Sequence, residues 1–182
     1  SAEHILMRMM LGRVSKEEIG IEIGAQISAF KDRLGMPTHV DSEKHMHAFA
    51  PFSAAAVTVA RENDISAMRC PKETLGGSGA ALMQRFKSWL LVRSADRLRR
   101  LAGQAGITTP ATFVGIGDTG RMTGERYRNI FDATDSGVTE IMTHPGYFND
   151  SEHTDFPSGF IKHTREIELQ GLLEPGLKEY AG

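Results

Sequence analysis

The sequence predicts an α/β fold made of parallel βα units. Helical and extended segments alternate with a period of about thirty residues, the spacing at which a helix connects two parallel strands. The expected strands are short apolar runs, as in sheets that are covered on both faces. Of the 182 residues, 40% are apolar and 24% charged, an ordinary composition for a globular protein. Because no linker-like segment interrupts the alternation, we expect one α/β domain over residues 1–182.

The first predicted helix has clear signals at both ends. Ser15 and Glu18 have the spacing of a capping box, in which each side chain accepts the other residue's backbone N–H. Gly35 stands where a helix commonly ends in a positive-φ residue, and Pro37 follows it. Between these signals, apolar residues recur at three- and four-residue steps: Ile19, Ile23, Ile27, Phe30 and Leu34. We therefore expect a helix between Ser15 and Gly35 with one apolar stripe.

The later elements follow from the same periodicities. Further helices are expected at residues 51–63, 80–105, 124–133 and 164–173. Extended segments or strands are expected at residues 37–47, 65–70, 112–116 and 138–144, and a polar loop at 148–160. The apolar residues of the 80–105 stretch predict a mostly buried helix or a helix pair: Leu82, Phe86, Trp89, Leu90, Val92, Leu98 and Leu101.

The number of βα units raises a problem of closure. A closed (β/α) barrel usually takes about 250 residues, more than this chain offers. An open parallel sheet would leave strand edges exposed. The chain is therefore a fragment, or its edges are covered by its own first helices or by another chain. From the exposed edges we expect self-association into a homo-oligomer.

Composition excludes several classes of protein. The net charge of −2 and the absence of a dominant basic block argue against nucleic-acid binding, and the basic stretch 93–100 is interpreted as a solvated helix face. Cys70 is the lone cysteine, so no intramolecular disulfide can form, and nothing near it suggests a nucleophile. No apolar run is long enough to span a membrane, and no signal-peptide pattern opens the chain. We expect a cytoplasmic location.

The extended segment 37–47 contains the first candidate site. Side chains on a strand alternate between faces, so the polar residues at odd positions would share one side. These residues are His39, Asp41, Glu43, His45 and His47. Imidazoles and carboxylates together suit a divalent ion such as Zn²⁺, Mn²⁺ or Mg²⁺. The alternative is a hydrophilic loop with exposed histidines.

A second candidate site lies at the end of the strand 138–144. His144 precedes Pro145-Gly146, which would turn the chain and place the imidazole at the mouth of the sheet. A histidine there can act as a general acid or base. Glu140 lies on the same face and could orient it. The alternative is a structural histidine bonded within the turn.

Two weaker signals accompany these sites. Arg69 ends the strand 65–70, where it could hold a substrate group or form an ion pair with Glu73. Residues 115–120 contain glycines that are faintly similar to a dinucleotide-binding loop, but their spacing before a helix is wrong, so we interpret them as a turn.

The motifs around these sites resemble those of the YdjC family. The run Pro-Thr-His-Val-Asp-Ser-Glu-Lys-His-Met-His at 37–47 is similar to the family's Pro-Thr-His-x-Asp-Ser-His-x-His-x-His signature. The run Glu-Ile-Met-Thr-His-Pro-Gly-Tyr at 140–147 resembles its Glu-x-x-x-His-Pro-Gly-Tyr motif, and 165–169 its closing Arg-x-x-Glu-Leu helix. The resemblance covers nearly the whole chain, and the branch associated with hopanoid biosynthesis is the most similar.

The resemblance implies a (β/α)-barrel enzyme that removes N-acetyl groups from sugars, with this chain forming the C-terminal portion of the barrel. It implies a divalent ion (Mg, Zn or Mn) that polarises the amide carbonyl and activates water. Carried over to this sequence, His144 and Asp41 are the catalytic residues. The expected metal ligands are Glu43, His45 and His47, and the expected substrate-binding residues are His39, Arg69, Tyr147 and Arg165.

This sequence departs from the family pattern in two ways. Glu43 stands where the family has the first histidine of its His-x-His-x-His run, which changes the charge of the expected metal site. The family's early Asp-Asp-Phe-Gly and Gly-x-His segments, which the resemblance implies supply a base and metal ligands, do not occur in the printed sequence. The alternative to a deacetylase is therefore a truncated, inactive remnant that at most binds sugar or a partner chain.

Overall fold

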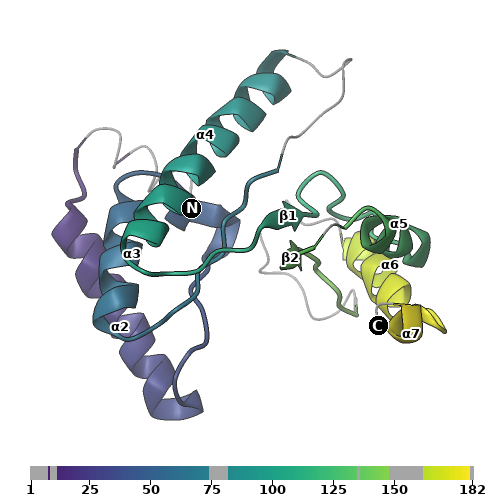
Figure 1. Cartoon of the computed structure of the whole chain (residues 1–182), viewed down its shortest axis with the longest axis horizontal. Coiled ribbons are helices and arrows are strands. Elements are labelled where there is room, and N and C mark those ends of the chain that lie inside the picture. The colour runs from purple at the N-terminus through teal and green to yellow at the C-terminus, as the bar shows by residue number, and fades with distance from the viewer. Residues whose placement is uncertain (1–7, 9–11, 74–81, 135, 148–161, 181–182) are drawn as a thin grey trace. The chain divides into compact units, whose positions relative to one another are not determined.

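The computed structural model describes residues 8, 12–73, 82–134, 136–147 and 162–180. The chain forms two compact units, Ser1–Ala111 and Thr112–Gly182 (Figure 1). Both combine helices with parallel strand pairing, so the predicted mixed α/β class is confirmed. That the chain is one domain stays a prediction.

The described residues of unit 1 include three long helices around short extended segments. The helices are α2 (Lys16–Leu34), α3 (Phe52–Glu62) and α4 (Leu82–Gln104). The extended segments meet in isolated parallel bridges, one joining Val40 to Met68 and the other Ala67 to Thr108. The predicted helices 51–63 and 80–105 are thus confirmed, whereas the predicted strand 65–70 is reduced to this narrow pairing.

The ends of α2 form as the sequence predicts. The backbone N–H of Ser15 donates to the Glu18 carboxylate at 2.8 Å, and that of Glu18 donates to the Ser15 hydroxyl at 3.1 Å. Gly35 ends the helix with a φ of 84°, which favours glycine. Its ψ of −169° lies outside the left-handed helical region, so the cap differs from the expected one.

The core of unit 1 forms where α2, α3 and α4 meet the extended segments. Its buried members include Val59, Ala60, Met68, Leu98 and Ala102. On α2, Ile19 and Ile27 are buried, but Phe30 and Leu34 are exposed, so only the first half of the predicted stripe faces the core.

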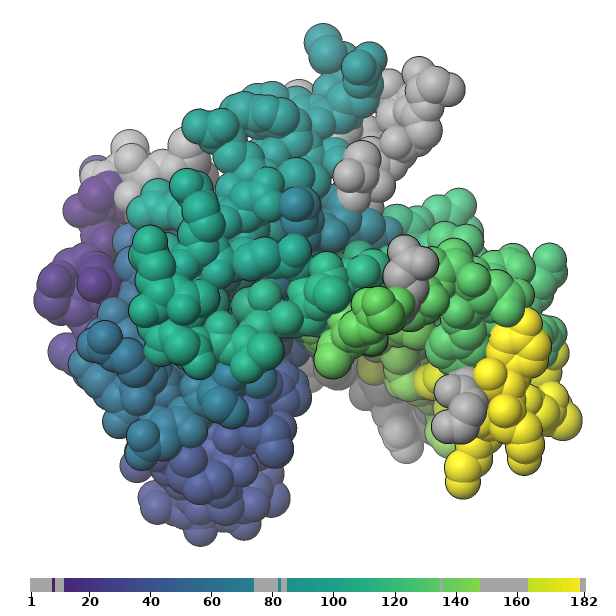
Figure 2. Space-filling model, in the orientation of Figure 1, coloured from purple at the N-terminus to yellow at the C-terminus, as the bar shows by residue number. Residues whose placement is uncertain are grey.

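The prediction that α4 is mostly buried is wrong for its first half. Leu82, Phe86, Trp89 and Leu90 are between 41% and 83% exposed. The buried face instead contains Leu91, Ala95, Leu98 and Ala102, at helical steps of three and four residues. The exposed first half of α4 extends beyond the other helices of unit 1 (Figures 1 and 2).

The segment after α2 is extended only as far as Ser42. Residues Glu43–Ala48 form a 3₁₀ helix, η1, with positive φ at Lys44 and His45. The predicted extended segment 37–47, with side chains alternating up to His47, is therefore wrong beyond Ser42. The physical reason is local: the Ser42 hydroxyl accepts the backbone N–H of His47 at 2.9 Å, which favours a turn over a strand.

Unit 2 contains a two-stranded parallel sheet and three helices. The strands are β1 (Thr112–Val114) and β2 (Thr139–Ile141), in register from Thr112 opposite Thr139. The helices are α5 (Gly124–Asp132), α6 (Lys162–Leu172) and α7 (Leu177–Tyr180). The core packs Met122, Tyr127, Ile130 and Leu177 against both strands.

The predicted strands of this unit form at shorter lengths, and the predicted helices shift by one or two residues at their ends. Both helices and both strands are confirmed, but β1 ends before Gly115, whose φ is 118°. A side chain at Gly115 would overlap the backbone carbonyl of Met142, so this close approach requires glycine. Residues 115–120 form the expected turn. The predicted loop 148–160 lies outside the described residues.

Candidate active site at the end of strand β2

The backbone at the end of β2 holds His144 next to a buried carboxylate. The N–H of Met142 donates to the carbonyl of Val114 at 2.8 Å, which fixes the end of the strand pairing. His144 follows two residues later with its side chain 27% exposed. The carboxylate belongs to Glu168 of α6, and its Oε2 lies 3.8 Å from His144 Nδ1. A histidine and a carboxylate therefore form a pair at the carboxyl end of a parallel strand.

Glu168 accepts hydrogen bonds from both loops that follow the strands. Its side chain is 1% exposed. One oxygen accepts the backbone N–H of Gly120, and the other accepts the backbone N–H of His144 and the hydroxyl of Thr143, the latter at 2.9 Å. Such donors stabilise the charged form of a buried carboxylate, which would otherwise be costly to bury.

The hydrogen bonds have a defined direction in this network. The Thr143 hydroxyl gives its proton to Glu168, so the phenol of Tyr127, 2.7 Å away, donates to Thr143. Burial raises the pKa of Tyr127, which keeps the phenol protonated at neutral pH. Tyr127 therefore donates to Thr143, and Thr143 donates to the Glu168 carboxylate.

Arg165 and Tyr147 lie on either side of the same turn. The Arg165 guanidinium donates to the His144 carbonyl at 3.4 Å, and the Gly146 N–H donates to the Arg165 carbonyl at 3.2 Å. Tyr147 is 80% exposed. The structure thus places Arg165 against the turn, while the Tyr147 ring is open to solvent.

The sequence analysis proposed a different carboxylate to orient His144. It named Glu140, which lies in β2 opposite Phe113, whereas the carboxylate against the imidazole is that of Glu168. The sequence signal for Glu168 was the Arg-x-x-Glu-Leu run at 165–169, in which it is the glutamate.

Unit 1 contains the second set of predicted residues. The bridge between Val40 and Met68 brings Asp41 next to Arg69, and their charged groups lie 2.8 Å apart. Arg69 therefore pairs with Asp41, an arrangement that the sequence analysis had not considered. The pair is partly open to water, with side-chain exposures of 42% for Asp41 and 19% for Arg69.

His47 is buried beneath this ion pair, and both of its ring nitrogens are engaged. Nε2 lies 2.9 Å from the carbonyl of Arg69, which can only accept, so Nε2 carries the proton. Nδ1 then accepts from the Ser42 hydroxyl at 2.7 Å. Burial lowers the pKa of His47, which agrees with a neutral ring.

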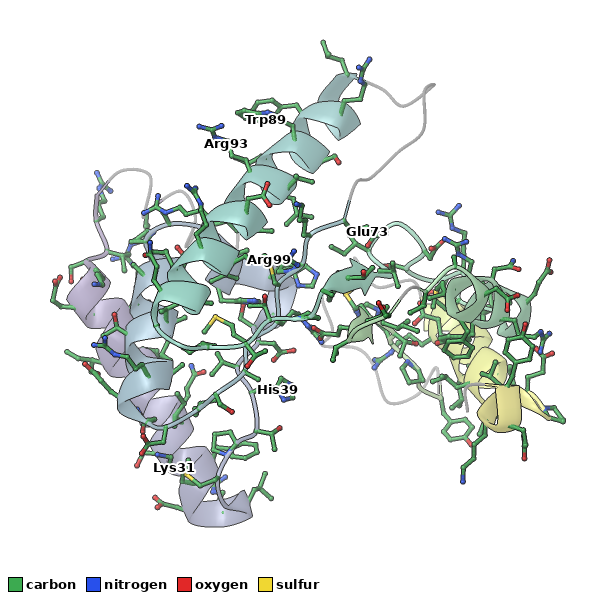
Figure 3. All side chains as sticks on the ribbon, in the orientation of Figure 1. Lys31, His39, Glu73, Trp89, Arg93 and Arg99 are labelled. Carbon is green, nitrogen blue, oxygen red and sulfur yellow. The ribbon has the colours of Figure 1, made fainter. Side chains whose placement is uncertain are left out.

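The remaining predicted ligands lie apart in this arrangement. His39 is exposed on the segment after α2, where its Nδ1 lies 3.0 Å from the Thr38 hydroxyl (Figure 3). Within the described residues, no three His, Cys, Asp or Glu side chains are grouped closely enough to hold a metal ion. As arranged here, Glu43, His45 and His47 do not fit a metal ion as a three-ligand set, because both nitrogens of His47 are already engaged.

Cys70 behaves as a packing residue. It is buried, its thiol donates to the Ala95 carbonyl at 3.4 Å, and burial raises its pKa. These features agree with the expectation that it is no nucleophile.

The fold and the His144 turn define an α/β protein with a histidine–carboxylate pair at a strand end. The model of the YdjC-like protein family matches residues 3–181, and the chain belongs to this family. No helix in the described ranges is both long and apolar enough to cross a bilayer.

Two relatives have curated names. A chitooligosaccharide deacetylase of Klebsiella pneumoniae (strain 342) is 39% identical over 69 residues, which are 37% of this chain and 27% of the relative. A carbohydrate deacetylase of Xenopus laevis is 28% identical over 165 residues, 78% of this chain and 53% of the relative. The chain therefore spans about half or less of the length of these relatives.

A solved structure shares the fold. It is described as a putative cellobiose-phosphate cleavage protein from Enterococcus faecalis V583, with a TM-score of 0.62 and 20% sequence identity. The match covers 93% of this chain and 57% of the other. At this identity the likeness concerns the fold alone.

Proposed function

We propose that this protein is a carbohydrate deacetylase, a hydrolase that removes N-acetyl groups from amino sugars or oligosaccharides. Family membership and the names of the two curated relatives support this class of reaction. The structural observation that carries the proposal is the His144 imidazole held against the buried Glu168 carboxylate at the end of β2. We also propose that the parallel βα units form part of a (β/α) barrel.

The geometry of His144 suits a general acid. Because Nδ1 is the ring nitrogen near Glu168, Nε2 points to the other side of the ring. An imidazole in this position can give a proton from Nε2 to a leaving group.

The proposed reaction is hydrolysis of the amide. Water adds to the carbonyl carbon and gives a proton to a carboxylate, the C–N bond breaks, and the nitrogen leaves as an amine that takes its proton from His144. The oxygen of water stays on the acetyl carbon, which leaves as acetate. Arg165 would hold the turn that presents the imidazole, since its guanidinium donates to the His144 carbonyl.

The polar residues of unit 1 would bind sugar hydroxyls. Asp41 and Arg69 form a partly exposed ion pair, which offers both an acceptor and donors to sugar hydroxyls. A catalytic role for Asp41 and the dependence on Mg²⁺, Zn²⁺ or Mn²⁺ are parts of the proposal. So are a cytoplasmic location and self-association, the latter to be tested by size-exclusion chromatography.

The test is acetate release by the purified chain from N-acetylated chitooligosaccharides. The assay is run after chelation and again after addition of each divalent ion. We expect His144→Ala to remove activity and Gln104→Ala, at an exposed position in the last turn of α4, to keep it. Sugar binding without acetate release under any condition would overturn the deacetylase proposal for this chain.

A further inference from the structure

A groove in unit 1 is lined by none of the predicted site residues. It is bounded on one side by Ala48 and Ala50, which follow the buried His47, and on the other by α4. Its volume is about 810 Å³. Three arginines of α4 line it: Arg93, Arg97 and Arg100.

The three arginines share one face of the helix. They follow one another at steps of four and three residues, which places their side chains in a row, and all three are exposed. Like charges at this spacing repel one another and destabilise the helix slightly. A row of cations beside a concave surface therefore costs stability unless an anion binds there.

The groove has little negative charge to offset this row. In the part of the chain that the structure describes, none of the three guanidinium groups has a carboxylate within 4.0 Å. Asp96 is the acidic residue of the lining, but its carboxylate lies 2.8 Å from the Lys72 ammonium, which already neutralises it. The groove is therefore strongly electropositive.

Arg99, a neighbouring arginine of α4, has a structural role that the three groove arginines lack. Arg99 donates to the carbonyls of Pro110 and Ala111 at 2.8 and 3.2 Å, so it ties α4 to the following segment. Arg93, by contrast, lies 5.7 Å from the centre of the exposed Trp89 ring, and both project from the outer side of α4 (Figure 3). Arg100 makes a long contact of 3.4 Å to a backbone carbonyl within its own helix.

We propose that this groove is a binding site for a phosphate monoester. Guanidinium groups bind phosphate oxygens through paired, charge-assisted hydrogen bonds, and several around one groove suit a dianion with three terminal oxygens. Leu90 and the two alanines give the groove apolar walls for the rest of the ligand. A soluble sugar phosphate and a lipid phosphate headgroup share this chemistry. The proposal does not depend on the deacetylase function.

The test is binding to the full chain, measured by isothermal titration calorimetry with glucose 6-phosphate and by flotation with vesicles. The vesicles are phosphatidylcholine with or without phosphatidic acid. Glucose and sodium chloride at matched ionic strength are the ligand controls. Arg97→Gln and Arg100→Gln should each weaken binding by about tenfold, the loss expected for one charge-assisted contact.

Arg85→Gln is the matched control, because Arg85 is exposed on the same helix outside the groove. It should bind as the parent does, and circular dichroism verifies that all three variants fold. Arginine-dependent binding of glucose 6-phosphate identifies a soluble ligand, and such binding of phosphatidic acid vesicles alone identifies a headgroup. Binding to neither, an equal effect of chloride, or an equal loss in Arg85→Gln would overturn the proposal.

Discussion

The His144 region and the Asp41 region both place charged groups where a parallel strand ends, but they differ in burial. Glu168 is 1% exposed and accepts hydrogen bonds from two loops. Asp41 is 42% exposed and pairs with an arginine at the surface. A buried carboxylate with several donors contributes far more to stability than a hydrated ion pair. The first arrangement fixes a turn, and the second leaves its charges available to a ligand.

The two histidines differ in the opposite direction. His47 is buried with both ring nitrogens bonded to protein atoms, whereas His144 is partly exposed and has one nitrogen beside a carboxylate. A ring whose nitrogens are both engaged maintains structure, while a partly exposed ring can exchange protons with a substrate. Burial thus separates a structural histidine from a candidate acid within one sequence.

Replacing the buried carboxylate should have the largest effect. Glu168→Gln removes the charge and turns an amide N–H toward groups that are themselves donors. We expect a loss of about 3 kcal/mol in the free energy of unfolding, the range for a disrupted buried polar network. Urea unfolding followed by circular dichroism measures it. Glu179→Gln, on the exposed face of α7, is the control, and equal losses in both variants would contradict the comparison.

The buried histidine should make stability depend on pH. Burial lowers the pKa of His47 below 6.5 in the folded chain, so the unfolded chain binds its proton first as pH falls. The contribution of His47 to stability is therefore constant at pH values above its unfolded pKa. It declines as the pH falls below that pKa, by at most about 1.4 kcal/mol per pH unit. Urea midpoints across this range test the decline, which His47→Gln should reduce. If the urea midpoint declines with falling pH as steeply in His47→Gln as in the parent chain, His47 is not the cause.

Removing the phenol at the far end of the network should have a smaller effect. Tyr127→Phe deletes the donor to Thr143 but keeps the ring in the core, so we expect a loss of about 1 kcal/mol. Thermal unfolding measures it, and Tyr147→Phe, at an 80% exposed position, should change nothing. Burial raises the pKa of Tyr127, and the hydrogen bond to Asp132 raises the pKa of Tyr180, so ultraviolet titration should show two tyrosines that ionise late in the parent and one in Tyr127→Phe. Identical titrations would count against the buried donor.

The smallest effect is expected at the surface pair. Asp41→Asn should cost less than about 1 kcal/mol of stability, because water screens a pair that is this exposed. Its effect on acetate release should be larger than its effect on stability if the pair binds substrate. Asp32→Asn, exposed on α2, serves as the reference. A stability loss comparable to that of Glu168→Gln would remove the distinction between the two regions.

The parts of the fold that the sequence predicted are those set by neighbouring residues. Ser15 and Gly35 determine the ends of α2 through contacts within one turn, and the prediction was confirmed. The same local logic failed at residues 43–47, because one hydroxyl, that of Ser42, replaced strand pairing by a turn. Periodicity describes which face is apolar and contains no information about such a hydrogen bond.

The sequence predicted which residue types form the candidate site, but it did not predict which side chains contact one another. His144 was found from the Pro-Gly turn that follows it, but its carboxylate lies 24 residues later, on another element. The exposure of Phe86 and Trp89 was missed for a similar reason: an apolar residue on a helix does not indicate what packs against it. Tertiary contacts decide both points.

The position of Glu168 also has a consequence for biosynthesis. Its carboxylate bonds to Gly120, 48 residues earlier, and to the His144 backbone, 24 residues earlier. During synthesis both loops leave the ribosome before the acceptor that holds them, so α6 must emerge and dock before His144 has its final position. Activity should therefore arise late in translation, and a chain that stops before residue 162 would keep its strands but lack a fixed imidazole.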